Sequence, residues 1–490
     1  MTDDDLSPAR FGEVFSNFLR AVVENAPKRG PILRDRLQAH LQTESTTLPV
    51  FTETFDRHDH PNVQVALNAW ADEGDDRETQ TIGVSGQHKE HVSGLISAAI
   101  GNDDFSGFPP LTEGAIDYAN YRLANDEVLP CVQFGLLLLS DGGHRLAVSV
   151  LGPSGQHGPR EKVLVEVVSL DPATGQAFIG ELRTLMSRLN VYRGHVISLS
   201  PGRMHMGPQT LVAFHDLPAI QRDNVILPEE LLERIERHTF VFAEHADRLR
   251  AAGRSLKRGM LLYGPPGTGK TLTLMYLIGR MEGRTVLLTT GLGMGLLDPV
   301  MQMARSLAPS MVILEDVDLI AEERGMPHSS GGLLFELLNQ LDGLEDDADL
   351  IFALTTNRPE ILEPALAARP GRVDLAVELP LPDADARRKL FELYGQGLEL
   401  IDVDLVSFAE QTDGASPAYI KELLRRAAVL AAVEGGELKV TSAHLSQAIE
   451  ELSEGGRLAR RILGFQHPDQ GSEFPIEPGF PGPHGAPWMG

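Results

Sequence analysis

Gly264-Pro265-Pro266-Gly267-Thr268-Gly269-Lys270-Thr271 is the stretch of the chain that decides its fold. It fits the phosphate-binding pattern of a glycine, four residues and then Gly-Lys-Ser/Thr. The apolar run at residues 260–263 precedes it and predicts a strand, and residues 272–278 follow it and predict a helix. A strand, a glycine-rich loop and a helix in this order are the context that the pattern requires, so the stretch predicts a nucleotide-binding P-loop.

The chemistry of this loop indicates a nucleoside triphosphate and Mg²⁺ as ligands. Glycines let the backbone curl so that several N–H groups point at one set of phosphates, with the positive end of a helix behind them. Lys270 is expected to reach the β- and γ-phosphates, and the hydroxyl of Thr271 is expected to bind Mg²⁺. The predicted nucleotide-binding set is the quoted stretch together with Leu272, the first residue of the predicted helix.

Composition bounds the class of protein. A length of 490 residues predicts two to four domains, and the single cysteine, Cys131, excludes an internal disulfide and suits a reducing compartment. The first residues are acidic, unlike a signal peptide, and no apolar run approaches membrane-spanning length. We therefore expect a cytoplasmic protein without a membrane segment. The formal net charge of −26 argues against nucleic acid as a partner, because phosphate contacts need clustered Lys and Arg.

Residues 1–215 predict an N-terminal α/β domain for recognition or docking. Its expected helices are residues 8–27, 31–41 and 172–190, and its expected strands are residues 132–139, 145–151, 163–169, 195–200 and 210–214. Residues 140–144 contain Gly-Gly and predict a hairpin. The polar residues His58, Asp59, His60, His88, Glu90 and His91 match no standard zinc spacing, so we expect no metal site among them.

Residues 216–382 predict the nucleotide-binding large domain, a doubly wound parallel sheet, because strands and helices alternate there. The buried strand at residues 311–314 is followed by the carboxylates Glu315, Asp316 and Asp318, and the strand at residues 350–355 runs into Asn357. Ligands of such sheets bind at the carboxyl ends of the strands, so one site can gather the loop and both polar segments.

Two segments complete the predicted organisation. Residues 383–455 predict a small helical domain, in which Ser416-Pro417 starts a helix with Ser as the cap and Pro at the first helical position. Residues 456–490 are rich in Pro and Gly and predict a disordered tail, because such a composition cannot bury a core.

Taken together, the motifs resemble the AAA family of ATPases over roughly residues 216–455. The matching segments are residues 262–271 (Walker A), 311–316 (Walker B), 338–343 (the helix that follows), 355–357 (the polar sensor) and 363–374 (the second region of homology). The resemblance implies that Asn357 orients the attacking water, and that Arg369 and Arg372 are fingers offered to the site of a neighbouring subunit. It therefore implies a homo-oligomeric ring, usually a hexamer. These roles agree with what phosphoryl transfer to water needs, which is a phosphate cradle, Mg²⁺, a positioned water and positive charge.

Three positions depart from the family pattern. Walker B normally reads Asp-Glu, whereas this chain has Glu315-Asp316; by position Glu315 would bind the metal and Asp316 would act on water, and which of them is the general base stays open. The reversed order is similar to that of the branch that includes the mitochondrial cytochrome bc complex assembly ATPase. The loop at residues 291–297 lacks the aromatic with which threading unfoldases grip their substrate, and Pro417 stands where many members have glycine.

The sequence thus predicts an ATP-hydrolysing ring that remodels or translocates a protein partner bound by residues 1–215. One alternative is a nucleotide-switched oligomeric scaffold with little turnover, which the reversed carboxylates motivate. Another is an unfoldase cap for a separate peptidase, although the sequence contains no HExxH zinc-protease motif and lacks the C-terminal ending that docks proteasomal ATPases. A small-molecule kinase is disfavoured, because it would leave Asn357, Arg369 and Arg372 unexplained.

Overall fold

The computed structural model describes thirteen stretches of the chain. They are residues 14–18, 20, 31–44, 48–86, 94–100, 110–153, 162–199, 212–289, 297–318, 349–360, 362, 373–435 and 438–454. The chain divides into two compact units. The first comprises residues 1–216, 283–313 and 348–350, and the second comprises residues 217–282, 314–347 and 351–490. The predicted domain boundaries stay a prediction, and each unit is described by itself.

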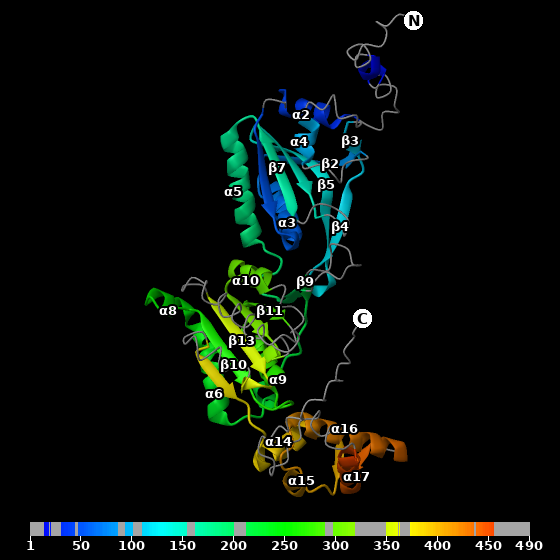
Figure 1. Cartoon of the computed structure of the whole chain (residues 1–490), viewed down its shortest axis with the longest axis vertical. Coiled ribbons are helices and arrows are strands. Elements are labelled where there is room, and N and C mark those ends of the chain that lie inside the picture. The colour runs from blue at the N-terminus through cyan, green and yellow to red at the C-terminus, as the bar shows by residue number, and fades with distance from the viewer. Residues whose placement is uncertain are drawn as a thin grey trace, which may run out of the picture. The chain divides into compact units, whose positions relative to one another are not determined.

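An antiparallel sheet forms the centre of the first unit (Figure 1). Its strands follow the order β1-β7-β6-β5-β2-β3, and β4 also pairs with β5. Their bounds are β1 Val50–Phe55, β2 Arg77–Ser85, β3 Thr112–Gly114, β4 Asp117–Arg122, β5 Val128–Asp141, β6 His144–Leu151 and β7 Val163–Ser169. The predicted hairpin joins β5 and β6, where Asp141 faces His144. Gly142 and Gly143 have positive φ angles of 51° and 94°, which a two-residue hairpin turn of this kind requires.

Helices cover both faces of this sheet, because its strands alternate apolar side chains between two cores. One core joins the helices α3 (His60–Asp72) and α5 (Pro172–Arg188) to Val148 and Val150 of β6. The other joins α2 (Leu33–Leu41) and α4 (Leu95–Ile100) to Ala147 and Leu151 of the same strand. Period-two alternation therefore builds a three-layer unit with the sheet in the middle.

The region between residues 44 and 130 shows elements that the sequence did not reveal. Besides β1 to β4, α3 and α4, it contains the short 3-10 helices η3 (Arg57–Asp59) and η4 (Ala124–Asp126). His60, Asn62 and Gln64 are buried on α3 among its apolar residues, which hides the amphipathic pattern of that helix. Of the predicted opening helix at residues 8–27, the described residues 14–18 and 20 are helical.

The second sheet carries the P-loop strand. Its order is β14-β10-β13-β12-β11-β8-β9. The bounds are β8 Val196–Leu199, β9 Val212–Phe214, β10 Arg258–Tyr263, β11 Thr285–Thr289, β12 Ser310–Leu314, β13 Leu350–Thr356 and β14 Leu375–Glu378. β10 pairs in parallel with both β13 and β14, and β11 pairs in parallel with β8, whereas β9 is antiparallel to β8. The prediction of a parallel, doubly wound sheet is confirmed. Unexpectedly, β8 and β9 belong to this sheet and not to the first.

Helices connect the strands of the second sheet. They are η6 Arg222–Asn224, α6 Glu229–His238, α7 Phe240–Glu244, α8 Ala246–Ala251, α9 Lys270–Arg280 and α10 Leu297–Ser306. The short helix α7 ends two residues before α8 begins. Among the described residues, none of the helices has both the length and the apolar character that crossing a membrane needs.

A small helical subdomain follows β14. It consists of α14 Ala384–Tyr394, α15 Leu405–Gln411, α16 Pro417–Glu434 and α17 Ser442–Glu454, with the short parallel pair β15 Glu399–Ile401 and β16 Lys439–Thr441 (Figure 1). Its core gathers around Phe391 and the buried face of α16, including Ile420, Leu423 and Leu424. The predicted start of α16 is confirmed, because the Ser416 hydroxyl accepts a hydrogen bond from the Tyr419 N–H as a helix cap does.

Candidate nucleotide-binding site

The glycine-rich loop connects the end of β10 to the first turn of α9. Gly267 and Gly269 have φ angles of 78° and 95°, a left-handed conformation that residues with a Cβ adopt at a cost. Gly264 has no room for a side chain, because a Cβ there would lie 2.4 Å from the Leu379 carbonyl oxygen. The glycines of the motif are therefore needed for the shape of the loop.

Lys270 is 7% exposed and points back into its own loop. Its Nζ donates hydrogen bonds of 2.9 Å to the carbonyl oxygens of Gly264 and Pro265. Burial lowers the pKa of Lys270, while the carboxylates of Asp316 and Asp318 act in the opposite direction. The ammonium group is thus held at the loop within electrostatic reach of both carboxylates.

The ends of β12 and β13 bring the predicted polar residues together. The Asn357 side-chain amide donates a hydrogen bond of 3.2 Å to Asp316 Oδ1, and the Asp316 N–H donates one of 3.0 Å to the Thr355 hydroxyl. Asp316 has a φ of 49°, which places it among the few left-handed residues other than glycine. The predicted meeting of the Walker B carboxylates with the polar sensor is observed for Asp316.

Asp318 is a site residue whose role the sequence analysis did not identify. Asp318 is 4% exposed, and its Oδ1 accepts hydrogen bonds from the Thr356 hydroxyl at 2.8 Å and from the Asn357 N–H at 3.3 Å. A carboxylate two residues beyond Walker B was visible in the sequence. Nothing local indicated that it would contact residues nearly forty positions away.

The start of α16 lies against the loop. The Ala418 N–H donates a hydrogen bond of 3.2 Å to the Gly267 carbonyl oxygen. A Cβ built on Gly267 would lie 2.8 Å from the Ser416 hydroxyl and 2.9 Å from the Ala418 Cβ. The small helical subdomain therefore packs on the phosphate-binding loop at its middle glycine.

The residues of this site fit a nucleoside triphosphate with Mg²⁺. The positive-φ glycines and the N-terminus of α9 form the kind of backbone cradle that binds phosphates. Mg²⁺ takes oxygen ligands, often one or two from protein together with phosphate oxygens and water. The exposed hydroxyl-bearing Thr271 and the half-buried Glu315 supply oxygens of this type, and Leu272 is half-buried beside them in sequence.

Some predicted residues lie outside the described part of the chain. Among them are Arg369 and Arg372, the helix at residues 338–343, and residues 291–296 of the loop that lacks an aromatic. Pro417 is described, and it occupies the first turn of α16 beside the loop.

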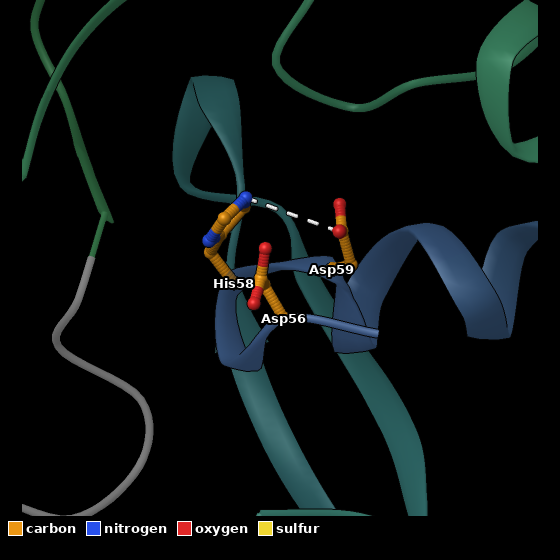
Figure 2. Close-up of side chains that lie close together, drawn as sticks. All are labelled: Asp56, His58 and Asp59. Atoms are coloured by element: carbon orange, nitrogen blue, oxygen red, sulfur yellow. Dashed lines mark ion pairs between the residues drawn. The ribbon is translucent and has the colours of Figure 1, made fainter. Parts of the chain in front are cut away.

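Three metal-ligating side chains lie close together in the first unit. Ligand atoms of Asp56, His58 and Asp59 lie within 4.8 Å of one another, and Figure 2 shows them at the turn that leads into α3. His58 Nε2 lies 3.9 Å from Asp59 Oδ2, and Lys162 Nζ lies 3.5 Å from Asp56 Oδ1. Each of the three side chains therefore has a polar partner within the first unit.

His60 does not belong to that group. Its ring nitrogens contact the Tyr121 hydroxyl at 3.0 Å and the Val132 carbonyl oxygen at 2.8 Å. Burial lowers the pKa of His60 to about 4, so the ring is neutral at pH 7. His88, Glu90 and His91 lie outside the described residues.

Comparison with known proteins covers the loop, the strand ends and the small subdomain. The family model "ATPase family associated with various cellular activities (AAA)" matches residues 260–381, and the model of the AAA+ lid domain matches residues 402–447. The ATP-dependent zinc metalloprotease FtsH 3 of Synechocystis is 31% identical over 278 residues, which are 54% of this chain and 43% of the relative.

Two further relatives show a similar level of identity over part of their length. The ATP-dependent zinc metalloprotease FtsH 1 of Sphaerobacter thermophilus is 32% identical over 280 residues, or 54% of this chain and 41% of the relative. FtsH of Mycobacterium tuberculosis, which carries the same description, is 32% identical over 239 residues, or 46% of this chain and 31% of the relative. The chain thus spans less than half the length of these curated relatives. Residues 260–381 are therefore an AAA ATPase domain, and residues 402–447 are its lid domain.

Proposed function

We propose that the chain is an ATP-hydrolysing, ring-forming AAA protein that remodels or translocates a protein partner. The observation that carries the proposal is the hydrogen bond from the Asn357 amide to Asp316 at the ends of β13 and β12. The Asp316 carboxylate can accept a proton, and the Asn357 amide can hold a water molecule. Lys270 of the phosphate-binding loop is within electrostatic reach of the same carboxylate. Water activation beside a phosphate cradle is what hydrolysis requires.

We assign the steps of hydrolysis as follows. The N–H groups of the loop and Lys270 hold the phosphates of ATP, and Asn357 orients the attacking water. Asp316 accepts the proton of that water as the water oxygen bonds to the γ-phosphorus and the bond to the departing ADP oxygen breaks, and Glu315 with Thr271 would hold the metal. Bound there, Mg²⁺ would neutralise charge on the phosphates. On this assignment the reversed Glu-Asp pair supports hydrolysis, and we propose that the chain is similar to the branch with the same reversed pair, which includes the mitochondrial cytochrome bc complex assembly ATPase.

We propose a homo-oligomeric ring, of the hexameric kind that the family resemblance implies, in which Arg369 and Arg372 complete the site of a neighbouring subunit. Residues 1–215 would bind the protein partner or an adaptor in the cytoplasm. A covalent and hydrogen-bonded connection between residues 1–215 and the ATPase sheet supports this role, because β8 of those residues pairs with β11 of that sheet. In addition, Arg193 donates a hydrogen bond of 2.9 Å to the Ala308 carbonyl oxygen, just beyond α10.

A cap for a separate peptidase is the second candidate. It is favoured by the printed descriptions of the relatives, which are ATP-dependent zinc metalloproteases, whereas this sequence contains no HExxH motif. On this reading the same ATP-driven ring would deliver its substrate to a protease encoded elsewhere. Peptidase activity recovered with the partner would favour this candidate.

Two substitutions test the proposal. Asp316→Asn should lower ATP turnover on the order of a hundredfold or more while retaining nucleotide binding, because general bases contribute about that much. Glu315→Gln should instead raise the Mg²⁺ concentration needed for half-maximal turnover, because it removes a proposed metal ligand. A pulldown with Asp316→Asn in ATP should retain the protein partner that the wild type releases. Negligible turnover by the assembled wild type, equal to that of both variants, would refute hydrolysis and favour a nucleotide-switched scaffold.

A further inference from the structure

We propose that Asp318 is a positioning residue for the hydrolytic site, and that it acts by fixing the backbone on which Asn357 is held. The inference rests on the proposed function, because it assigns to Asp318 a part in orienting the water-holding amide. Asp318 follows β12 by four residues, and Asn357 follows β13 directly. The contact between them is therefore made by the ends of two strands of one sheet.

Asp318 fixes the turn after β13 at two successive residues. Oδ1 accepts one hydrogen bond from the Thr356 hydroxyl and a second from the Asn357 N–H. The Thr356 hydroxyl in turn accepts a hydrogen bond of 2.9 Å from the Arg358 N–H. The backbone before and after Asn357 is thus tied to one buried carboxylate, and the Asn357 side chain has its direction set from both sides.

The consequence for Asn357 follows from its own contact. Its amide reaches Asp316 Oδ1 at 3.2 Å, near the outer limit of a good hydrogen bond. A small rotation of the turn would therefore break that contact. Asp318 does not touch Asp316 in this scheme, and it acts on the proposed general base only through the position of Asn357.

The competing role for a buried carboxylate here is charge balance for Lys270. Burial lowers the pKa of Lys270, and the negative charge of Asp318 opposes that lowering. The two roles make different demands on the side chain. Positioning needs an oxygen that accepts two hydrogen bonds, and the amide oxygen of asparagine can do this. Charge balance needs the negative charge, which asparagine lacks.

Comparing Asp318→Ala with Asp318→Asn separates these roles. Asp318→Ala should lower kcat about tenfold or more, with the KM for ATP and the affinity for a fluorescent ATP analogue within about threefold of wild type, since a hydrogen bond to a charged group is lost. Asp318→Asn should recover most of kcat. Equal loss of kcat in both variants, or loss of nucleotide affinity in place of kcat, would overturn the positioning role.

Asp404 offers a matched control for general destabilisation. Its Oδ1 accepts hydrogen bonds from the Val406 and Ser407 N–H groups at the start of α15, so Asp404→Ala also removes an aspartate oxygen with two donors. It should lower thermal stability with kcat unchanged. If Asp404→Ala lowers kcat as much as Asp318→Ala, the effect of Asp318 is one of stability and the inference fails.

Two further measurements test the role of Asp318 if Asp318→Ala does not fold or if the wild type does not hydrolyse ATP. Should Asp318→Ala not fold, Thr356→Val removes the hydroxyl that Asp318 binds, whereas Thr356→Ser keeps it; kcat should fall in the first and not in the second. Crystal structures of the wild type and of Asp318→Ala test the positioning role even if the wild type does not hydrolyse ATP. The Asn357 amide should leave Asp316 in the variant, and its staying within hydrogen-bond distance would overturn the inference without bearing on hydrolysis.

Discussion

Gly267→Ala tests the contact between the phosphate-binding loop and the lid. Gly267 lies in the left-handed region at a φ of 78°, and its carbonyl oxygen accepts the Ala418 N–H. An added Cβ would meet the Ser416 hydroxyl at 2.8 Å, which is closer than real Cβ contacts come. Because Ser416 caps α16, the hydroxyl cannot move away without weakening its bond to the Tyr419 N–H.

The expected magnitude has two parts. The left-handed backbone costs an alanine about 1–2 kcal/mol relative to glycine. Displacing the Ser416 cap costs about 1 kcal/mol more, the usual loss when a helix cap is removed. Gly267→Ala should therefore lower the free energy of unfolding of the nucleotide-free protein by about 2–3 kcal/mol.

Gly269→Ala is the matched control, because Gly269 has a φ of 95° and a Cβ there would have no atom within 4 Å. It carries the backbone cost alone, about 1–2 kcal/mol. The measurement is urea denaturation of both full-length variants without nucleotide, followed by circular dichroism. Equal destabilisation by the two substitutions would refute the contact between loop and lid, as would a Gly267→Ala protein that equals wild type.

Two other predictions concern stability in the first unit. The folded state holds the pKa of His60 at about 4 against 6.5 in the unfolded chain, so stability should be lost as pH falls from 6.5 to 4, by about 3 kcal/mol in total. Urea denaturation at pH 7 and pH 4.5 should show this loss in wild type, and a His60→Gln protein with the same pH dependence would contradict it. Asp349→Ala should cost about 3–5 kcal/mol, because it leaves the buried Arg284 guanidinium, 2.7 Å from Asp349 Oδ1, without its carboxylate. Replacing both residues with apolar ones should cost less than Asp349→Ala in the same assay, and an equal or larger cost would contradict the prediction.

The parts of the site that could be predicted from sequence are those set by neighbouring residues. The loop at residues 264–271 needs glycines within a few positions, and Ser416 caps a helix that begins at the next residue. Such features depend on backbone conformations that single residue types favour. Strand ends could also be predicted, because residues 311–314 and 350–354, inside two buried strands, are continuous apolar runs followed by polar residues.

The remaining features depend on pairings between distant segments, which no local pattern encodes. β8 pairs with β11, whose residues lie about ninety positions later, and Asp318 accepts a hydrogen bond from Thr356 at the end of another strand. On α3, Gln64 is buried because its side-chain oxygen accepts the Val132 N–H, so a polar residue occupies an inward position. In each case the position of the strand or of the polar side chain is explained only by the distant segment that it contacts.

The reversed carboxylates of Walker B have a physical explanation in the backbone at Asp316. Its φ of 49° is left-handed, a conformation in which Asp and Asn are several-fold enriched over longer side chains. A glutamate at this position would pay more for the same backbone, and its carboxylate would extend one methylene farther from the Asn357 amide. With aspartate second in the pair, the residue that contacts Asn357 is the one that best tolerates the turn, and glutamate occupies position 315. The order Glu315-Asp316 therefore suits the local backbone that brings the carboxylate and the amide together.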